Sequence, residues 1–143
     1  MRTRGTPQNG RVVLLVDADA DTRTMYAEYL RYQGFHVMPV ATAGRALMLA
    51  SKVDVIVTEL LLPGFMDGIG LIEQLKSDHE SSGTPLIVVT ACAWERERMR
   101  AEHAGCDRFL PKPCLPDELA REARQLLATT PSRPTVLARH PVP

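Results

Sequence analysis

The sequence contains few cysteines, and their spacing argues against a cross-linked or metal-bound fold. Three cysteines occur in 143 residues, at Cys92, Cys106 and Cys114. Their number is odd and no two of them have Cys-x-x-Cys spacing, so we expect neither a disulfide framework nor a zinc site. Reduced thiols of this kind are typical of cytoplasmic proteins, and we expect the chain in that compartment.

The sequence also lacks the segments that carry proteins to or through a membrane. Its first ten residues, MRTRGTPQNG, contain no apolar core of the kind that a signal peptide needs. No apolar run approaches the roughly 20 residues of a membrane-spanning helix. We therefore expect no membrane segment.

The absence of a net charge hides an uneven distribution of charged residues. Residues 11–128 hold all 17 acidic residues but only 13 of the 17 basic ones. An acidic central region argues against nucleic acid as the main partner. The fifteen residues after position 128 are too few for a helix-turn-helix domain, so a DNA-binding output domain would have to follow in a longer protein.

What the sequence does contain is the composition and pattern of one globular domain. Its residues are 45% apolar and 24% charged, which suits a chain of this length with a single core. We expect that domain over residues 11–128. A flexible polar arm (1–10) would precede it, and a proline-rich disordered tail (129–143) would follow it.

Five short apolar runs, each followed by a helical pattern, predict the fold. The expected strands are Val12–Val16, Phe35–Val40, Asp54–Thr58, Pro85–Val89 and Arg108–Leu110. The expected helices cover about Thr22–Leu30, Ala43–Ser51, Ile69–Ser77, Trp94–Ala104 and Pro116–Leu127. Strands that alternate with amphipathic helices predict a doubly wound, flavodoxin-like α/β fold. It would have five parallel strands in the order 2-1-3-4-5 and five helices.

Polar side chains follow four of the predicted strands. In chain order they are Asp17 (with Asp19 two residues later), Glu59, Thr90 and Lys112. The carboxyl ends of parallel strands lie at one edge of a sheet, so we expect these side chains to converge there. Carboxylates hold Mg²⁺, and hydroxyl and ammonium groups contact phosphate oxygens. The edge therefore suits a hard cation and a phosphoryl group.

Each of these residues has a simpler explanation when it is taken alone. An Asp after a buried strand often caps the next helix, as Asp19 or Asp21 could do here. A single Thr or Lys at a strand end is usually solvated. Glu59 is harder to explain in this way, because it follows a buried strand and precedes three leucines. The joint placement at four strand ends is what indicates a site.

Four segments resemble the signature segments of response-regulator receiver domains: VVLLVDADADTR, DVIVTELLLPGFMDG, PLIVVTACA and AGCDRFLPKP. The resemblance covers residues 11–128 in the family's order and spacing. It implies a signalling domain of a two-component phosphorelay and not an enzyme. It also implies that an Asp after the third strand takes a phosphoryl group from a histidine kinase or a small phosphodonor. An acidic pair after the first strand would hold Mg²⁺.

By position, the resemblance assigns a role to each residue of the expected site. Glu59 stands at the phosphoacceptor position, and Asp17 is the first acid of the metal pair. Thr90 and Lys112 match the residues that contact the phosphoryl group.

Two residues near the fifth strand also match the family pattern. Phe109 matches an aromatic switch residue, although packing alone explains an aromatic side chain there equally well. Because Phe lacks a hydroxyl group, it should prefer burial. Pro113 matches a proline whose preceding peptide bond is cis, which X–Pro bonds allow. The resemblance also makes the fourth helix, fifth strand and fifth helix a candidate face for a homodimer or another partner.

The sequence departs from the family pattern at the expected site. Glu59 replaces the phosphoacceptor Asp, and Ala18 replaces the second acid of the metal pair. In addition, Phe65 and Met66 stand where the family usually has one residue. The extra methylene group of Glu59 displaces its carboxylate by about 1 Å, which can slow a reaction roughly 10²-fold. Without an acid at position 18, Mg²⁺ binding should be weak, and Asp19 is the residue that could compensate.

Two hypotheses follow for Glu59. In the first, its carboxylate reaches Thr90 and Lys112 and imitates a phosphorylated Asp. In the second, it merely pairs with Lys112 and locks the site. The sequence favours the second, because one carboxylate lacks the charge and the three oxygens of a phosphoryl group.

The sequence as a whole favours a degenerate receiver that acts as a protein-interaction module without phosphotransfer. The main alternative is a working receiver that is phosphorylated on Glu59 and binds Mg²⁺ weakly. A less favoured alternative is a haloacid-dehalogenase-like phosphatase, since Asp17-Ala18-Asp19 fits its Asp-x-Asp fragment. That family calls for Thr or Val where Asp21 stands, and its late acidic pair is missing.

Overall fold

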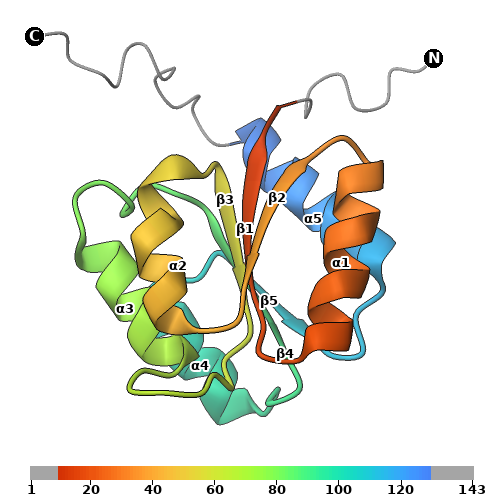
Figure 1. The fold of residues 1–143 in the computed structure, drawn as a ribbon. Coiled ribbons are helices and arrows are strands. Elements are labelled where there is room, and N and C mark those ends of the chain that lie inside the picture. Colours follow the sequence, from red (N-terminus) through yellow and green to blue (C-terminus); the bar gives the residue numbers. More distant parts are fainter. Residues whose placement is uncertain (1–9, 130–143) are drawn as a thin grey trace, which may run out of the picture.

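The computed structural model describes residues 10–129, so the predicted arm and tail lie outside the described residues except for Gly10 and Thr129. The described part is built on one sheet of five parallel strands (Figure 1). The strands are β1 (Val12–Val16), β2 (His36–Val40), β3 (Val55–Thr58), β4 (Leu86–Thr90) and β5 (Arg108–Pro111). Their order is β2-β1-β3-β4-β5, which confirms the predicted doubly wound α/β fold.

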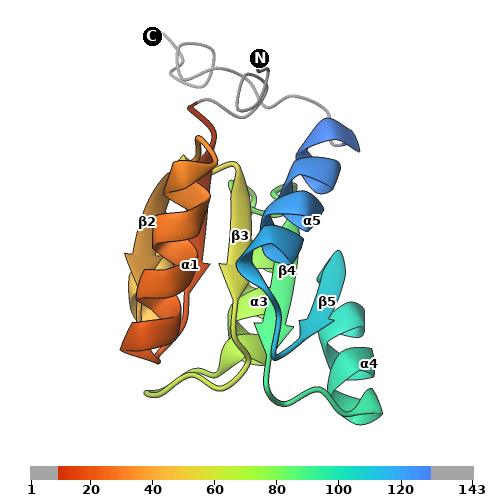
Figure 2. The same cartoon turned by 90° about the vertical axis from the view of Figure 1, so that its right-hand side faces the viewer.

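Helices cover both faces of the sheet (Figure 2). They are α1 (Ala20–Tyr32), α2 (Ala43–Leu49), α3 (Gly68–Ser77), α4 (Glu95–Ala104) and α5 (Pro116–Thr129), with a 3₁₀ turn at Ala50–Lys52. Helices α1 and α5 lie on one face, whereas α2, α3 and α4 lie on the other. No helix within residues 10–129 is both long and apolar enough to cross a membrane.

The inner strands are buried on both faces, because alternate residues point into opposite layers. In β1, Val13 and Leu15 pack in the layer of α1 and α5, whereas Leu14 and Val16 pack with α2, α3 and α4. All four side chains are at most 1% exposed. A sheet covered on both faces therefore requires continuous apolar runs, and such runs made the strands predictable.

The observed element boundaries differ from the predicted ones by one or two residues. Strand β4 extends to Thr90, one residue beyond its predicted end, so Thr90 belongs to the sheet. Trp94 precedes α4 as its N-cap, with extended backbone, and is not its first helical residue. Asp54 lies outside β3, and its carboxylate accepts a hydrogen bond from the backbone N–H of Val12 at 2.8 Å. These shifts leave the order and type of the elements unchanged.

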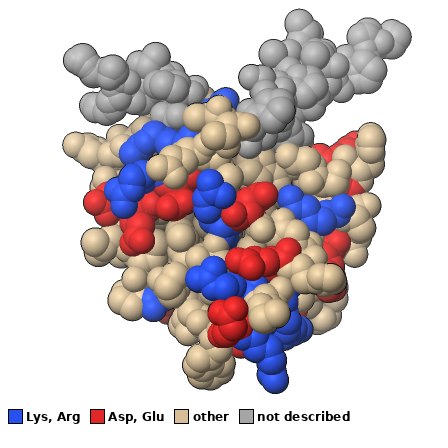
Figure 3. Space-filling model, turned by 180° about the vertical axis from the view of Figure 1, so that it is seen from behind, with Lys and Arg blue, Asp and Glu red and all other residues tan. Residues whose placement is uncertain are grey.

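The face that carries α4, β5 and α5 shows basic and acidic side chains next to one another (Figure 3). Arg108 of β5 pairs with Glu122 of α5 at 3.1 Å, and Arg98 pairs with Glu102 within α4 at 3.3 Å. Charges of opposite sign are therefore adjacent on this face.

Candidate functional site at the carboxyl edge of the sheet

The sheet brings four predicted side chains together at its carboxyl edge. Asp17 directly follows β1, Glu59 directly follows β3, and Thr90 is the last residue of β4. Lys112 follows β5. Asp17, Glu59 and Thr90 are at most 5% exposed, so the cluster lies beneath the surface. The expected convergence of the strand ends is therefore present in the structure.

Lys112 bridges the two carboxylates of the cluster. Its Nζ donates a hydrogen bond to Oδ2 of Asp17 at 2.9 Å and lies 3.1 Å from Oε2 of Glu59. Burial alone would lower the pKa of the Lys112 ammonium. The hydrogen bonds to Asp17 and Glu59 outweigh that effect, and the pKa is raised. Lys112 therefore stays charged between the two acids.

One oxygen of Glu59 accepts hydrogen bonds from its own chain and from β4. Oε1 accepts from the backbone N–H of Leu60 at 2.6 Å and from that of Leu61 at 3.2 Å. The hydroxyl of Thr90 also donates a hydrogen bond to Oε1. The side chain of Glu59 thus turns back toward the start of its own loop, and the Thr90 hydroxyl joins the ends of β3 and β4.

The other oxygen of Glu59 faces the cation. Oε2 lies next to Lys112 and accepts a long hydrogen bond from the backbone N–H of Ala91 at 3.4 Å. Burial alone would raise the pKa of the Glu59 carboxyl, but the hydrogen bonds from Thr90 and Lys112 hold it below its ordinary value. Both oxygens are therefore engaged, and the group is ionised at neutral pH.

The carboxylate of Asp17 also accepts hydrogen bonds through both of its oxygens. Its Oδ1 accepts a hydrogen bond from the backbone N–H of Asp19 at 2.9 Å, and its Oδ2 accepts from Lys112. The guanidinium of Arg23 donates to the backbone carbonyl of Asp17 at 2.7 Å, which ties this residue to α1. Both oxygens of this carboxylate thus have donors that belong to the chain itself.

Asp19, the residue that could compensate for Ala18, serves as the N-cap of α1. Its Oδ2 accepts from the backbone N–H of Thr22 at 2.9 Å and from the Thr22 hydroxyl at 2.6 Å. The hydrogen bond from the Thr22 side chain lowers the pKa of the Asp19 carboxyl. The neighbouring Ala18 is exposed and has no ligand atom in its side chain. Within residues 10–129, no group of three or more His, Cys, Asp or Glu is arranged to hold a metal ion.

Close packing of α3 fixes the backbone of Glu59. A Cβ atom on Gly68 would lie 2.5 Å from the carbonyl oxygen of Glu59, so α3 can begin here only with glycine. The backbone N–H of Gly68 donates to the carbonyl of Leu60 at 2.8 Å. Sequence reasoning did not find this contact, although the Asp67-Gly68 pair in the loop was its visible signal.

Phe109 is buried, as its lack of a hydroxyl group predicts. Its side chain is 7% exposed and belongs to the core layer of α2, α3 and α4. The guanidinium carbon of Arg98 lies over the ring, 5.0 Å from its centroid. The contact was not predicted, because Arg98 belongs to a helix in which most residues are charged.

The loop between β5 and α5 carries Lys112 and is tied to α1. The Lys112–Pro113 peptide bond is cis, in agreement with the prediction. The hydroxyl of Tyr26 donates a hydrogen bond to the carbonyl of Cys114 at 2.7 Å. Burial raises the pKa of the Tyr26 hydroxyl well above its ordinary value, so it remains a donor. The sequence analysis placed Tyr26 within the first helix but did not predict this hydrogen bond.

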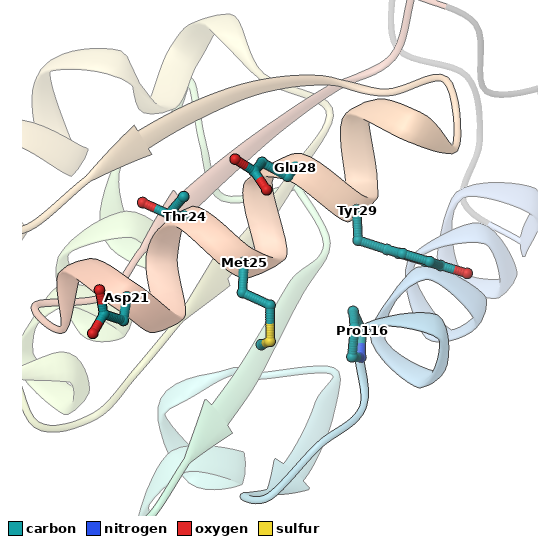
Figure 4. Close-up of a pocket in the computed structure, with 6 residues that line it drawn as sticks. All are labelled: Asp21, Thr24, Met25, Glu28, Tyr29 and Pro116. Atoms are coloured by element: carbon teal, nitrogen blue, oxygen red, sulfur yellow. The ribbon is translucent and has the colours of Figure 1, made fainter.

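An open depression lies beside this loop, between α1 and the start of α5 (Figure 4). Figure 4 shows the side chain of Met25 directed toward the space next to Pro116, with the ring of Tyr29 on the α5 side. The acidic Asp21 and Glu28 also line the depression. None of the four clustered strand-end residues lines it, so it is separate from the cluster.

Comparison with known families gives one match that covers most of the described chain. The family model "Response regulator receiver domain" matches residues 13–124. The match includes all four clustered residues and every strand of the sheet.

Curated regulators match over the same region. The transcriptional regulatory protein GltR of Pseudomonas aeruginosa is 31% identical over 121 residues, which cover 83% of this chain and 50% of GltR. The transcriptional regulatory protein CpxR of Klebsiella pneumoniae is 32% identical over 116 residues, which cover 80% of this chain and 48% of CpxR. The chain thus spans about half the length of these curated relatives.

Solved structures share the fold. The receiver domain of the sensor histidine kinase PA1611 from Pseudomonas aeruginosa is 27% identical with a TM-score of 0.77, over 84% of this chain and 99% of that domain. That structure holds a magnesium ion in its active-site cleft. A putative response regulator from Chloroflexus aurantiacus is 28% identical with a TM-score of 0.75, over 84% of this chain and 99% of the other.

Proposed function

Since this chain belongs to the response regulator receiver domain family, we propose that it is a degenerate receiver that works as a protein-interaction module in signal transduction, without phosphotransfer. The observation that carries the proposal is that the Glu59 carboxylate contacts both Thr90 and Lys112. In this family the corresponding position receives the phosphoryl group, and here the residue at that position is bound by the residues that should meet the phosphate.

The hydrogen bonds of Glu59 oppose its use as a nucleophile. A carboxylate attacks phosphorus through a free lone pair, and donors that stabilise the anion lower its reactivity. Oε1 has three donors, from Leu60, Leu61 and Thr90, and Oε2 has Lys112 and Ala91. Phosphoryl transfer would require the displacement of these contacts. It would also require in-line geometry from a side chain that is one methylene longer than Asp.

The contact with Thr90 favours the first hypothesis for Glu59, in which its carboxylate imitates a phosphorylated Asp, over the second, in which it only pairs with Lys112. The two hypotheses for Glu59 differ in this contact, because a lock needs Lys112 alone. Glu59 reaches both residues, so its carboxylate takes the two contacts that the family resemblance gives to the phosphoryl group. This differs from the preference that the sequence suggested. We infer that the domain is held in a single state that does not depend on a kinase.

The side-chain oxygens that could bind a metal at this site also argue against a need for Mg²⁺. Mg²⁺ requires several charged or polar oxygens in near-octahedral geometry. Ala18 supplies none, Asp19 caps α1, and the oxygens of Asp17 already accept from the chain. The ammonium of Lys112 lies between the two remaining carboxylates and offsets one of their two negative charges. The residues present therefore do not suit the ion that the PA1611 domain holds.

We place the module in the cytoplasm, with a histidine kinase or another signalling protein as its partner. The free thiols of Cys92, Cys106 and Cys114 support this compartment. The α4–β5–α5 face remains a candidate surface for a homodimer. Family membership leaves the phosphatase alternative without an observation that favours it.

Incubation with a small acyl phosphate and Mg²⁺, followed by intact-mass measurement, tests the proposal. We expect no phosphate adduct on the natural sequence. The matched positive control is the double variant Ala18→Asp/Glu59→Asp, which restores both acids of the family pattern and should gain an adduct on residue 59. An adduct on the natural chain that maps to Glu59 would overturn the proposal in favour of a working receiver.

A further inference from the structure

Phe109 lies on the edge strand of the sheet, where few elements can cover its outer side. Strand β5 has β4 as its single neighbour, and Phe109 is in register with Val88 of that strand. The ring is nevertheless only 7% exposed. Its cover includes the guanidinium of Arg98 from α4, whose central carbon lies 5.0 Å from the ring centroid. A guanidinium at this distance is attracted by the negative face of an aromatic ring.

Two acidic residues of α4 hold Arg98 in this position. Glu95, three residues earlier, lies 3.9 Å from its Nε, and Glu102, four residues later, accepts a hydrogen bond from its Nη1 at 3.3 Å. These spacings place all three side chains on one side of the helix. The Arg98 side chain is 42% exposed, so it forms the outer layer over the ring and the core forms the inner layer.

Phe109 shares a face of the sheet with Thr90, the residue that contacts Glu59. Thr90 comes two residues after Val88, so Thr90 and Val88 point to the same face of the sheet. Phe109 and Val88 belong to the core layer on that face. The Thr90 hydroxyl is directed to Glu59 at the carboxyl edge. The aromatic side chain therefore lies on the sheet face that also carries Thr90, with Arg98 on its outer side.

We propose that Arg98 is a positioning residue that keeps Phe109 in its inward orientation. The inference rests on the proposed function, because a receiver whose phosphoacceptor position is filled by Glu59 has no use for an aromatic residue that moves. Arg98 opposes the outward movement of the ring directly, because that movement would displace the guanidinium from between Glu95 and Glu102. As a result, α4 and β5 present one unchanging surface to a partner.

Nuclear magnetic resonance of the full chain with ¹³C-labelled phenylalanine rings tests the role of Arg98. The chain has three phenylalanines, which makes assignment simple. In the natural chain we expect strong contacts between the Phe109 ring and the Val88 methyl groups. In Arg98→Ala these contacts should weaken, with the outward fraction of the ring raised about two- to fivefold. In Arg98→Glu the effect should be larger, because a carboxylate repels both the ring face and the two neighbouring acids.

Three controls separate positioning from a general loss of structure. Arg98→Lys keeps the charge and should restore part of the inward population. Arg100→Ala removes an exposed arginine of the same helix and should change nothing. The signals of Phe35, which lies in the opposite core layer, report whether each variant is folded.

The proposal is overturned if the contacts between Phe109 and Val88 are the same in Arg98→Ala, Arg98→Glu and the natural chain. This result would reject the role of Arg98 without testing the proposed function. A phosphate adduct on Glu59 would remove the proposed function even if Arg98 positions the ring, and an immobile ring in every variant would remove the role of Arg98 alone.

Discussion

The hydroxyl of Thr90 donates a hydrogen bond to the carboxylate of Glu59, although the two residues are separated by 31 positions in the chain. The contact joins the ends of two neighbouring parallel strands at a point where both residues are buried. It is therefore a link within the tertiary structure and not a local turn. Several measurable consequences follow from this link and from its neighbours.

Replacement of Glu59 by Gln should destabilise the fold. The substitution keeps the shape of the side chain but removes the charge that faces Lys112 and that Thr90 stabilises. We expect the free energy of unfolding to fall by ~1–3 kcal/mol, the usual cost when a buried hydrogen-bonded charge loses its partner. Urea denaturation measures the change. Glu73→Gln, on the exposed side of α3, is the matched control and should leave the midpoint unchanged.

Acid should weaken the fold through Glu59. The pKa of this carboxyl is lower in the folded protein than its ordinary value of 4.5, so the folded state favours the ionised form. The resulting stability is fully present above pH 4.5 and disappears as the pH falls through the lower folded value. Denaturation curves from neutral to acidic pH should show this loss in the natural chain. If Glu59→Gln loses as much stability over the same interval, the assignment to Glu59 is wrong.

Loss of the cap on α1 should have a moderate cost and no effect on metal binding. Asp19→Ala removes the acceptor for the backbone N–H and hydroxyl of Thr22. We expect unfolding to become easier, as when other N-cap residues are removed. Asp21→Ala removes an acid from the first turn without removing the cap, and it should cost less. A large change in Mg²⁺ affinity on loss of Asp19 would show that this residue is a ligand after all.

Mg²⁺ should leave the stability of the natural chain unchanged. A ligand that binds only the folded state raises the free energy of unfolding in proportion to the logarithm of its concentration. Since Lys112 already lies between Asp17 and Glu59 and offsets one of their two negative charges, we expect no such rise. The double variant Ala18→Asp/Glu59→Asp should show one. Thermal unfolding at several Mg²⁺ concentrations distinguishes the two, and a metal-dependent midpoint in the natural chain contradicts the expectation.

The hydroxyl of Tyr26 should stabilise the loop that carries Lys112. Tyr26→Phe removes the donor to the buried carbonyl of Cys114, at a cost of about 1 kcal/mol. Hydrogen exchange should become faster in the segment between β5 and α5. Tyr32→Phe serves as the comparison, because the Tyr32 side chain is 80% exposed. Equal exchange in both variants would mean that the hydrogen bond contributes nothing to the loop.

The sequence predicted the fold well because the fold depends on patterns that a sequence carries directly. Runs such as VVLLV are required by a sheet with two covered faces, and the strand ends then place Asp17, Glu59, Thr90 and Lys112 at one edge. The partners of individual oxygens could not be predicted in the same way. Whether Glu59 pairs with Lys112 alone or also with Thr90 depends on side-chain rotamers and on backbone donors in the loop.

The contact between Arg98 and Phe109 also could not be predicted from the sequence. A helix with the sequence ERERMRAEHA has charged residues in nearly every direction, so its periodicity does not reveal which arginine covers an aromatic ring. The angle between α4 and β5 decides this. The sequence also could not decide the role of Asp19, because an acid after a strand suits both a helix cap and a metal ligand.

The hydrogen bond from Tyr26 has a mechanical consequence for the charged cluster. Its donor belongs to the middle of α1, and its acceptor, the Cys114 carbonyl, is two residues beyond Lys112 in the chain. One hydrogen bond and a segment of two residues therefore connect the buried side of α1 to the Lys112 ammonium. The Tyr26 hydroxyl therefore anchors, against the middle of α1, the same short segment whose ammonium contacts Glu59.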